Sequence, residues 1–154
     1  MTGLLPRPSL MLAPLRYLPS KPLELLIAEA STRLLAEPLE DGALSGLADG
    51  ALRVELTDPD IVLRFTVANG RVRPAQSDND TRVVVRAALE DLLLVTAQRM
   101  DPDTLFFQRR LRVEGDTALG LEVKNLLDTV DPATLPVPMQ GLLGRAADTI
   151  PGSR

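Results

Sequence analysis

The sequence predicts an α+β fold, in which an antiparallel sheet of about five strands carries helices on one face. Apolar and polar residues alternate in several short segments between residues 52 and 114, as strands with one buried face do. Signals for tight turns lie between the first three of these segments, and tight turns favour antiparallel pairing of the strands that they join. Apolar residues also recur at helical spacing before and after the strand region. The 154 residues are enough for one domain with a real core.

The chain begins with an apolar arm over residues 1–21 that four prolines interrupt. These prolines forbid a long amphipathic helix and favour an arm laid over the domain. The other interpretation is an interfacial element that touches a membrane or covers the mouth of a cavity. A helix then begins near Pro22, a residue suited to the first helical position, and ends by Pro38. Its apolar stripe consists of Leu23, Leu26, Ile27, Ala30 and Leu34.

Four strands are predicted after this helix. Asp58–Pro59 forms the turn between the first two, and Asn69–Gly70 is the strongest hairpin signal because both positions accept a positive φ. Pro74 ends the third strand, and a polar loop separates it from the fourth. The predicted strands cover residues 52–57, 61–67, 71–73 and 81–86.

A second main helix is predicted over residues 88–99, and it is apolar around most of its circumference. Only Glu90, Asp91 and Gln98 are clearly polar. Such a helix is buried on more than one side. It is either a central core helix or a helix that lies on the sheet with one face and lines a cavity with another.

The last strand and the last main helix are joined by a sharp turn. A strand over residues 110–114 leads into Gly115, where the absence of a Cβ permits a tight exit. Asp116 can cap the helix over residues 117–130. The extended connector 135–138 then leads to an amphipathic segment that Gly141 and Gly144 weaken. This segment is either a loosely held lid or a surface helix docked on the core.

Composition excludes several classes of chemistry. The chain has no His and no Cys, so it lacks the commonest general base near neutral pH, thiol nucleophiles, and the nitrogen and sulfur ligands of zinc. Glu114 and Asp116 are better explained as a strand end and a helix cap than as an acid–base pair. The net charge of −4 repels nucleic acid. We therefore expect no catalytic residue, metal site or cofactor.

The N-terminus lacks a basic region and a cleavage pattern, and charges or prolines interrupt every apolar run. With no cysteine, nothing indicates an oxidising compartment. A cytoplasmic location is predicted, and a peripheral contact with the inner membrane stays open.

The segment over residues 106–128 reads FFQRRLRVEGDTALGLEVKNLLD. It resembles the sterol carrier protein 2 family, in which a strand, a glycine turn and a helix follow a short helical turn, here residues 101–108. The resemblance runs from about Leu23 to about Asp131 and is strongest in its last third. It implies three parts: an arm over residues 1–21, a lipid-binding domain over 22–131, and a connector with an amphipathic lid over 132–154.

The resemblance further implies an apolar tunnel between the sheet and the helices. The expected lipid-binding residues, including three from the lid, are Phe65, Val83, Val85, Leu89, Leu92, Leu93, Leu105, Phe106, Leu119, Val123, Leu126, Leu127, Met139, Leu142 and Leu143. Arg109 and Arg110 are candidate contacts for an anionic head group. The alternative for these arginines is a scattered basic surface.

Within this family, the segment is most similar to accessory factors of bacterial ubiquinone biosynthesis. The resemblance implies a non-catalytic carrier that presents polyprenylated aromatic intermediates of the oxygen-independent branch to hydroxylating partners, the UbiU–UbiV pair. Two alternatives stay open: a general phospholipid or fatty-acyl carrier, and a protein-interaction scaffold with a solid core. A homodimer also stays open, whereas a nucleic-acid partner is not expected.

Overall fold

The computed structural model describes residues 7, 8, 10, 14, 17, 19–76 and 80–151. Most of the predicted arm therefore lies outside the described residues. The strands are β1 (Ala51–Thr57), β2 (Asp60–Ala68), β3 (Arg71–Pro74), β4 (Thr81–Ala87) and β5 (Leu111–Gly115). The helices are α2 (Ser20–Leu34), α3 (Ala36–Glu40), α4 (Leu89–Thr96), α5 (Pro102–Phe107), α6 (Thr117–Asp128) and α7 (Val137–Asp148), with short 3-10 turns η2 (Ser45–Leu47) and η3 (Pro132–Thr134).

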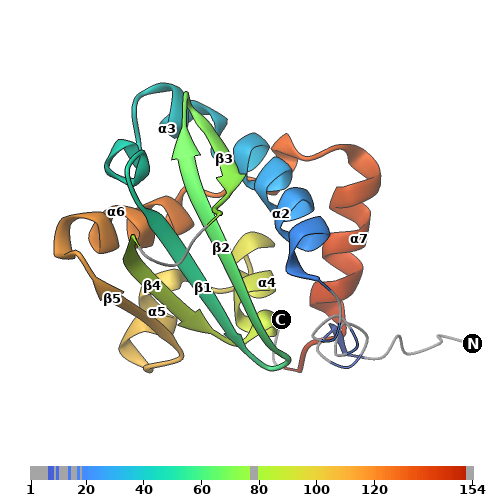
Figure 1. The fold of residues 1–154 in the computed structure, drawn as a ribbon. Coiled ribbons are helices and arrows are strands. Elements are labelled where there is room, and N and C mark those ends of the chain that lie inside the picture. Colours follow the sequence, from blue (N-terminus) through green and yellow to red (C-terminus); the bar gives the residue numbers. More distant parts are fainter. Residues whose placement is uncertain are drawn as a thin grey trace, which may run out of the picture.

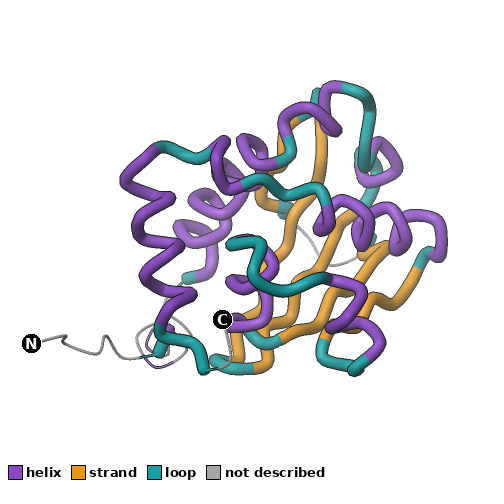
Figure 2. The backbone as a smooth tube through the Cα atoms, turned by 180° about the vertical axis from the view of Figure 1, so that it is seen from behind, coloured by secondary structure: helices purple, strands orange, loops and turns teal. Residues whose placement is uncertain are grey.

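The strands form one five-stranded sheet in the order β3-β2-β1-β4-β5. Helices cover one face of this sheet, as the view from behind shows, and the opposite face is open (Figures 1 and 2). In Figure 1, α2 and α7 lie on one side, α5 and α6 lie on the other, and α4 lies between them. The α+β class, the five strands and the placement of the helices are therefore confirmed.

The sheet is mostly antiparallel, as predicted, but its central pair of strands departs from that prediction. Strands β1 and β4 are parallel, with Val54 opposite Val85, while the other three pairs of strands are antiparallel. The loop after β3 returns the chain to the end of the sheet where β1 begins, and the N–H of Ala51 donates to the carbonyl of Asp80. Turn signals report only on strands that are neighbours in sequence, so this long-range pair left no local signal.

The turns that the sequence predicts are present. Asn69 and Gly70 have φ values of 54° and 71°, as their hairpin requires. Gly115 has a φ of 112°, and a Cβ there would lie 2.2 Å from the backbone oxygen of Arg82. Asp116 caps α6, because its side chain accepts a hydrogen bond of 2.9 Å from the N–H of Leu119. Glycine is thus required where β5 turns into α6.

Helix α2 packs along β3 at one edge of the sheet, and its burial differs from the predicted stripe. Leu26 is 61% exposed, whereas Glu24 is only 2% exposed. The carboxylate of Glu24 accepts from the N–H of Arg64 at 3.1 Å, and the hydroxyl of Thr32 accepts from the N–H of Val72 at 3.0 Å. Polar side chains on α2 therefore satisfy backbone groups at this edge, an arrangement that apolar periodicity cannot predict.

The core lies between the sheet and the helices. One cluster joins the sheet to α5 and α6, a second joins β1 and β2 to α2, and a third joins α4 to Ala147 and Ile150 at the C-terminal end of α7. No helix of the described residues is both long and apolar enough to cross a bilayer.

Candidate lipid-binding site

Most of the fifteen residues predicted to bind lipid meet in the layer between the sheet and the helices. Seven are buried there: Phe65, Val83, Val85, Leu105, Leu119, Val123 and Leu126. Four are partly buried and pack against the core clusters: Leu89, Leu92, Leu93 and Leu127. Leu143 is also partly buried, whereas Phe106, Met139 and Leu142 lie at the surface.

This apolar layer is packed with side chains. Val83 and Leu105 have no exposed surface, and Leu63, Leu94 and Leu111 are almost as deeply buried. Three surface grooves on the described part of the chain, of about 710, 370 and 440 Å³, are open to solvent. None of the three follows the layer between the sheet and the helices, and the tunnel stays a prediction.

The largest of these grooves has a mixed lining of apolar and charged residues. It lies beside the C-terminal end of α2 and α3, and Glu37, Asp41, Glu122 and Asp131 line it together with Arg33. Leu127 lines a second groove, near the ends of α4 and α6, and it is the one predicted lipid-binding residue that borders any of the three.

Helix α4 is the structural centre of the layer. Leu89 packs against the cluster beside α2, Leu92 packs against both large clusters, and Leu93 packs against the cluster beside α7. The helix is thus buried on several sides, as its apolar circumference predicts. Any chain-like ligand in the layer would lie against this helix.

Two carboxylates on α4 are buried although the sequence marks them as its polar side. Glu90 is 8% exposed and Asp91 is 7% exposed. The guanidinium of Arg7 donates to both oxygens of Glu90, with Nε at 2.9 Å. The guanidinium of Arg110 likewise donates to both oxygens of Asp91. Each buried charge therefore has a bidentate partner.

These ion pairs tie distant segments to α4. The hydrogen bonds to Glu90, together with the charge of that carboxylate, raise the pKa of Arg7 above its ordinary value. A guanidinium is charged at any ordinary pH even without this shift, so the cation of this pair is not lost as pH rises. Arg7 belongs to the arm, so the ion pair anchors that part of the arm on the helical side.

The two candidate head-group arginines have different surroundings. Arg110 is engaged by Asp91 and also donates to Gln108 at 3.2 Å. Arg109 is exposed, has a φ of 59°, and makes no ion pair with any described residue. Of the two, Arg109 is therefore the one whose guanidinium can meet an external anion.

Sequence analysis missed Arg7 and Glu90 as a linked pair and treated Arg110 as a free cation. Two adjacent carboxylates in an otherwise apolar helix are a signal that each needs a buried partner. The partners lie 83 and 19 residues away in sequence, so the pattern of the helix could not identify them.

Helix α7 is held by few contacts. Ala147 is its one fully buried residue, and Arg99 pairs with Asp148 at its C-terminal end. Its N-terminal half leaves Val137, Met139 and Leu142 exposed. Helix α7 is thus held on the layer mainly at its C-terminal end.

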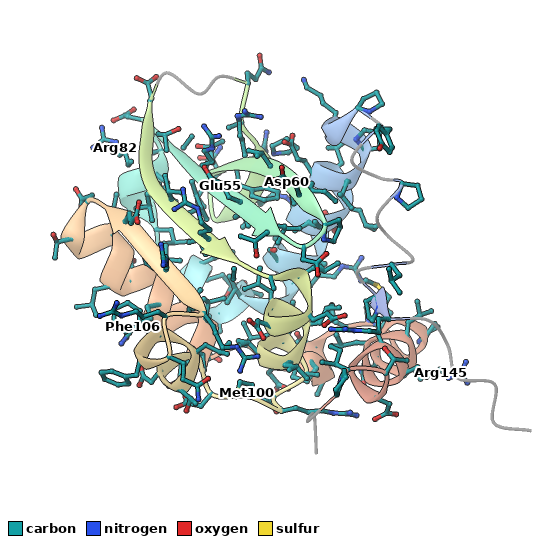
Figure 3. The ribbon with its side chains drawn as sticks, turned by 90° about the horizontal axis from the view of Figure 1, so that it is seen from below. Glu55, Asp60, Arg82, Met100, Phe106 and Arg145 are labelled. Carbon is teal, nitrogen blue, oxygen red and sulfur yellow. The ribbon has the colours of Figure 1, made fainter. Side chains whose placement is uncertain are left out.

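Figure 3 shows Met100 and Arg145 on the helical side of the molecule, while Glu55 and Arg82 lie on the open face of the sheet.

The architecture described above has known relatives. Residues 28–128 match the model of the SCP-2 sterol transfer family, and the chain belongs to this family. The chain is 36% identical over 146 residues to the ubiquinone biosynthesis accessory factor UbiT of Escherichia coli (strain K12), covering 93% of this chain and 82% of that protein. The UbiT of E. coli O157:H7 is equally similar. Within the family, the chain is therefore a homologue of UbiT.

A solved structure supports membership of the same family. The UbiJ-SCP2 ubiquinone synthesis protein is 25% identical to this chain, with a TM-score of 0.56, and the match covers 73% of this chain and all of that one. The resemblance to sterol carrier protein 2 in the sequence is thus confirmed by a family model, by curated relatives and by a fold.

Proposed function

We propose that the protein is a non-catalytic, lipid-binding accessory factor of ubiquinone biosynthesis. The observation that carries the proposal is the similarity to UbiT over 93% of the chain, together with membership of a sterol-transfer family. The apolar layer around α4 supplies the physical basis, since its core clusters consist of apolar side chains and the two buried carboxylates on α4 are each held by an arginine. Such a layer can shelter a chain-like lipid but offers it no chemistry.

The cargo we infer is a polyprenylated aromatic intermediate of the oxygen-independent branch. A prenyl tail is costly to expose to water, and each buried CH₂ contributes about 0.8 kcal/mol. The tail would lie against α4 while the aromatic ring stays near the surface. There the ring is accessible to hydroxylating enzymes of the UbiU–UbiV type. Arg109, beside the layer and without a partner among the described residues, is positioned to contact an acidic ring substituent.

Loading the layer requires it to open, and α7 is the segment we propose as the lid. Lifting α7 would expose Leu93 and Leu94 on α4, and it would break the small apolar cluster that these residues form with Ala147 and Ile150. The connector between α6 and α7 would let α7 move by itself. The strands β1 to β5 and α6 would keep their contacts with one another. The three-part division into arm, lipid-binding domain and lid follows from this proposal.

A peripheral contact of this cytoplasmic protein with the inner membrane would bring cargo to the lid. Exposed apolar side chains lie on α7 (Val137, Met139 and Leu142) and on α2 (Leu25 and Leu26). Both helices occupy the same side of the molecule (Figure 1). Apolar side chains gathered on one side of a protein are suited to the interface of a bilayer.

Native mass spectrometry with lipid identification tests the proposal on full-length protein purified from anaerobically and aerobically grown cells. We expect a one-to-one complex with a prenylated aromatic compound in the anaerobic sample. Phospholipid alone in both samples would replace the proposal with a general acyl carrier. Lipid-free protein that still binds hydroxylating enzymes would replace it with a scaffold.

A further inference from the structure

The two edges of the sheet differ in how they are protected. At the β3 edge, side chains of α2 bind backbone groups of the sheet. The hydroxyl of Thr32 accepts a hydrogen bond from the N–H of Val72 on β3, and the carboxylate of Glu24 accepts one from the N–H of Arg64 on β2. Strand β5 forms the other edge, with β4 as its one neighbour in the sheet. An uncovered edge strand offers backbone groups to any further strand that approaches it.

The register shows which groups of β5 are free. Glu114 lies opposite Val84, and Arg112 lies opposite Arg86. The hydrogen bonds between the two strands continue to Asp116, whose N–H donates to the carbonyl of Arg82. Because hydrogen bonding alternates along an antiparallel strand, the even-numbered residues face β4. Leu111, Val113 and Gly115 therefore turn their N–H and C=O groups to the free side. No hydrogen bond from another segment of the described chain reaches them.

The charges beside these groups are arranged for self-pairing. If a second β5 aligns antiparallel with Val113 opposite its own copy, then Arg112 faces the Glu114 of that copy, and the reverse pair forms as well. Both pairs occupy non-hydrogen-bonded positions, where opposed side chains lie closest. A shift of two residues in either direction would place Arg112 opposite Arg112 or Glu114 opposite Glu114, and like charges opposite one another are destabilising.

Both charged side chains are available for such pairing. Arg112 is exposed and makes no ion pair within the described part of the chain. The side chain of Glu114 is 60% exposed, and its one ion pair with a described residue is a long contact of 3.9 Å with Arg86. Neither side chain would have to give up a strong partner inside its own subunit.

Exposed apolar residues adjoin this edge. Phe106 and Phe107 lie at the end of α5, just before β5, and Leu121 lies on α6, just after it. Both helices contact β5, and Figure 3 shows Phe106 at the same end of the molecule as this strand. A second subunit at the edge would come close to these side chains and could shield them from water.

We propose that the protein forms a two-fold symmetric dimer in which β5 pairs antiparallel with β5 of a second copy. The two sheets then continue through the interface, and Val113 lies on the symmetry axis. The interface is isologous, so each Arg112–Glu114 pair occurs twice. This assembly leaves α7 free and does not depend on bound lipid.

Sedimentation velocity of the full chain over a range of concentrations tests this assignment. The wild-type protein is expected to be a dimer. Arg112→Glu and Glu114→Arg each place like charges opposite one another at both sites, and each should raise the dissociation constant by at least about tenfold. Mixing the two variants restores opposite charges at both sites, so a one-to-one heterodimer should form.

Arg73→Glu is the matched control, because it makes the same charge reversal on the exposed face of the opposite edge strand. It should remain dimeric. The double variant Arg112→Glu/Glu114→Arg should also dimerise alone, and this keeps the test valid if a single variant folds poorly. A monomeric wild type, a dimer that survives in both single variants, or a mixture that stays monomeric would overturn the proposal.

Discussion

The docking of α7 can be tested by shortening Ile150. This side chain is 6% exposed and packs with Leu94 and Ala147 in the small cluster that holds α7 on α4. Ile150→Ala removes three buried carbons, which at about 0.8 kcal/mol each amounts to about 2.4 kcal/mol of docking free energy. If opening of α7 limits lipid exchange, the open population and the exchange rate should rise by up to about 50-fold.

Leu142→Ala is the matched control, because it removes the same number of carbons from the same segment at a position that is 70% exposed. Its exchange rate should stay close to that of the wild type. The assay is the transfer of a fluorescent prenylated lipid from the loaded protein to vesicles, with hydrogen exchange of α7 amides measured in parallel. Equal transfer rates for the two variants would refute the assignment of α7 as the lid.

Three further outcomes follow from the geometry. Arg109→Ala should weaken the binding of anionic but not neutral lipid in a vesicle competition assay, and equal losses would count against charge recognition. Arg110→Ala should lower the free energy of unfolding by about 1–3 kcal/mol, because it leaves Asp91 buried without its cation; an unchanged urea midpoint would contradict this. Gly115→Ala should destabilise the fold by about 2 kcal/mol or more, whereas Gly141→Ala, on an open helical surface, should raise the melting temperature slightly.

Local patterns in the sequence predicted the elements of the fold well, because the forces that form those elements act between near neighbours. Alternation located the strands, Asn69–Gly70 located a hairpin, and the Gly115–Asp116 pair located the turn and the cap before α6. The parallel pairing of β1 with β4 depends on contacts between residues about 30 positions apart. No short-range pattern encodes such a contact.

The candidate site was predicted less completely for a related reason. Helical periodicity shows that Leu92 and Val123 face inward, but it does not distinguish a packed core from a cavity wall. The burial of Glu24 and Glu90 could not be predicted either, because it depends on the N–H of Arg64 and on the guanidinium of Arg7. These partners come from a neighbouring strand and from the arm.

The central claim is that the layer around α4 opens to enclose a prenyl tail. The most direct measurement is methyl NMR of the full-length protein with a prenylated aromatic lipid that carries a spin label at the end of its tail. We expect strong broadening of the methyl signals of Leu92, Leu93 and Leu119, which pack inside the layer. Broadening confined to exposed methyl groups such as those of Leu25 and Leu142 would show that lipid binds only outside, and it would contradict the account.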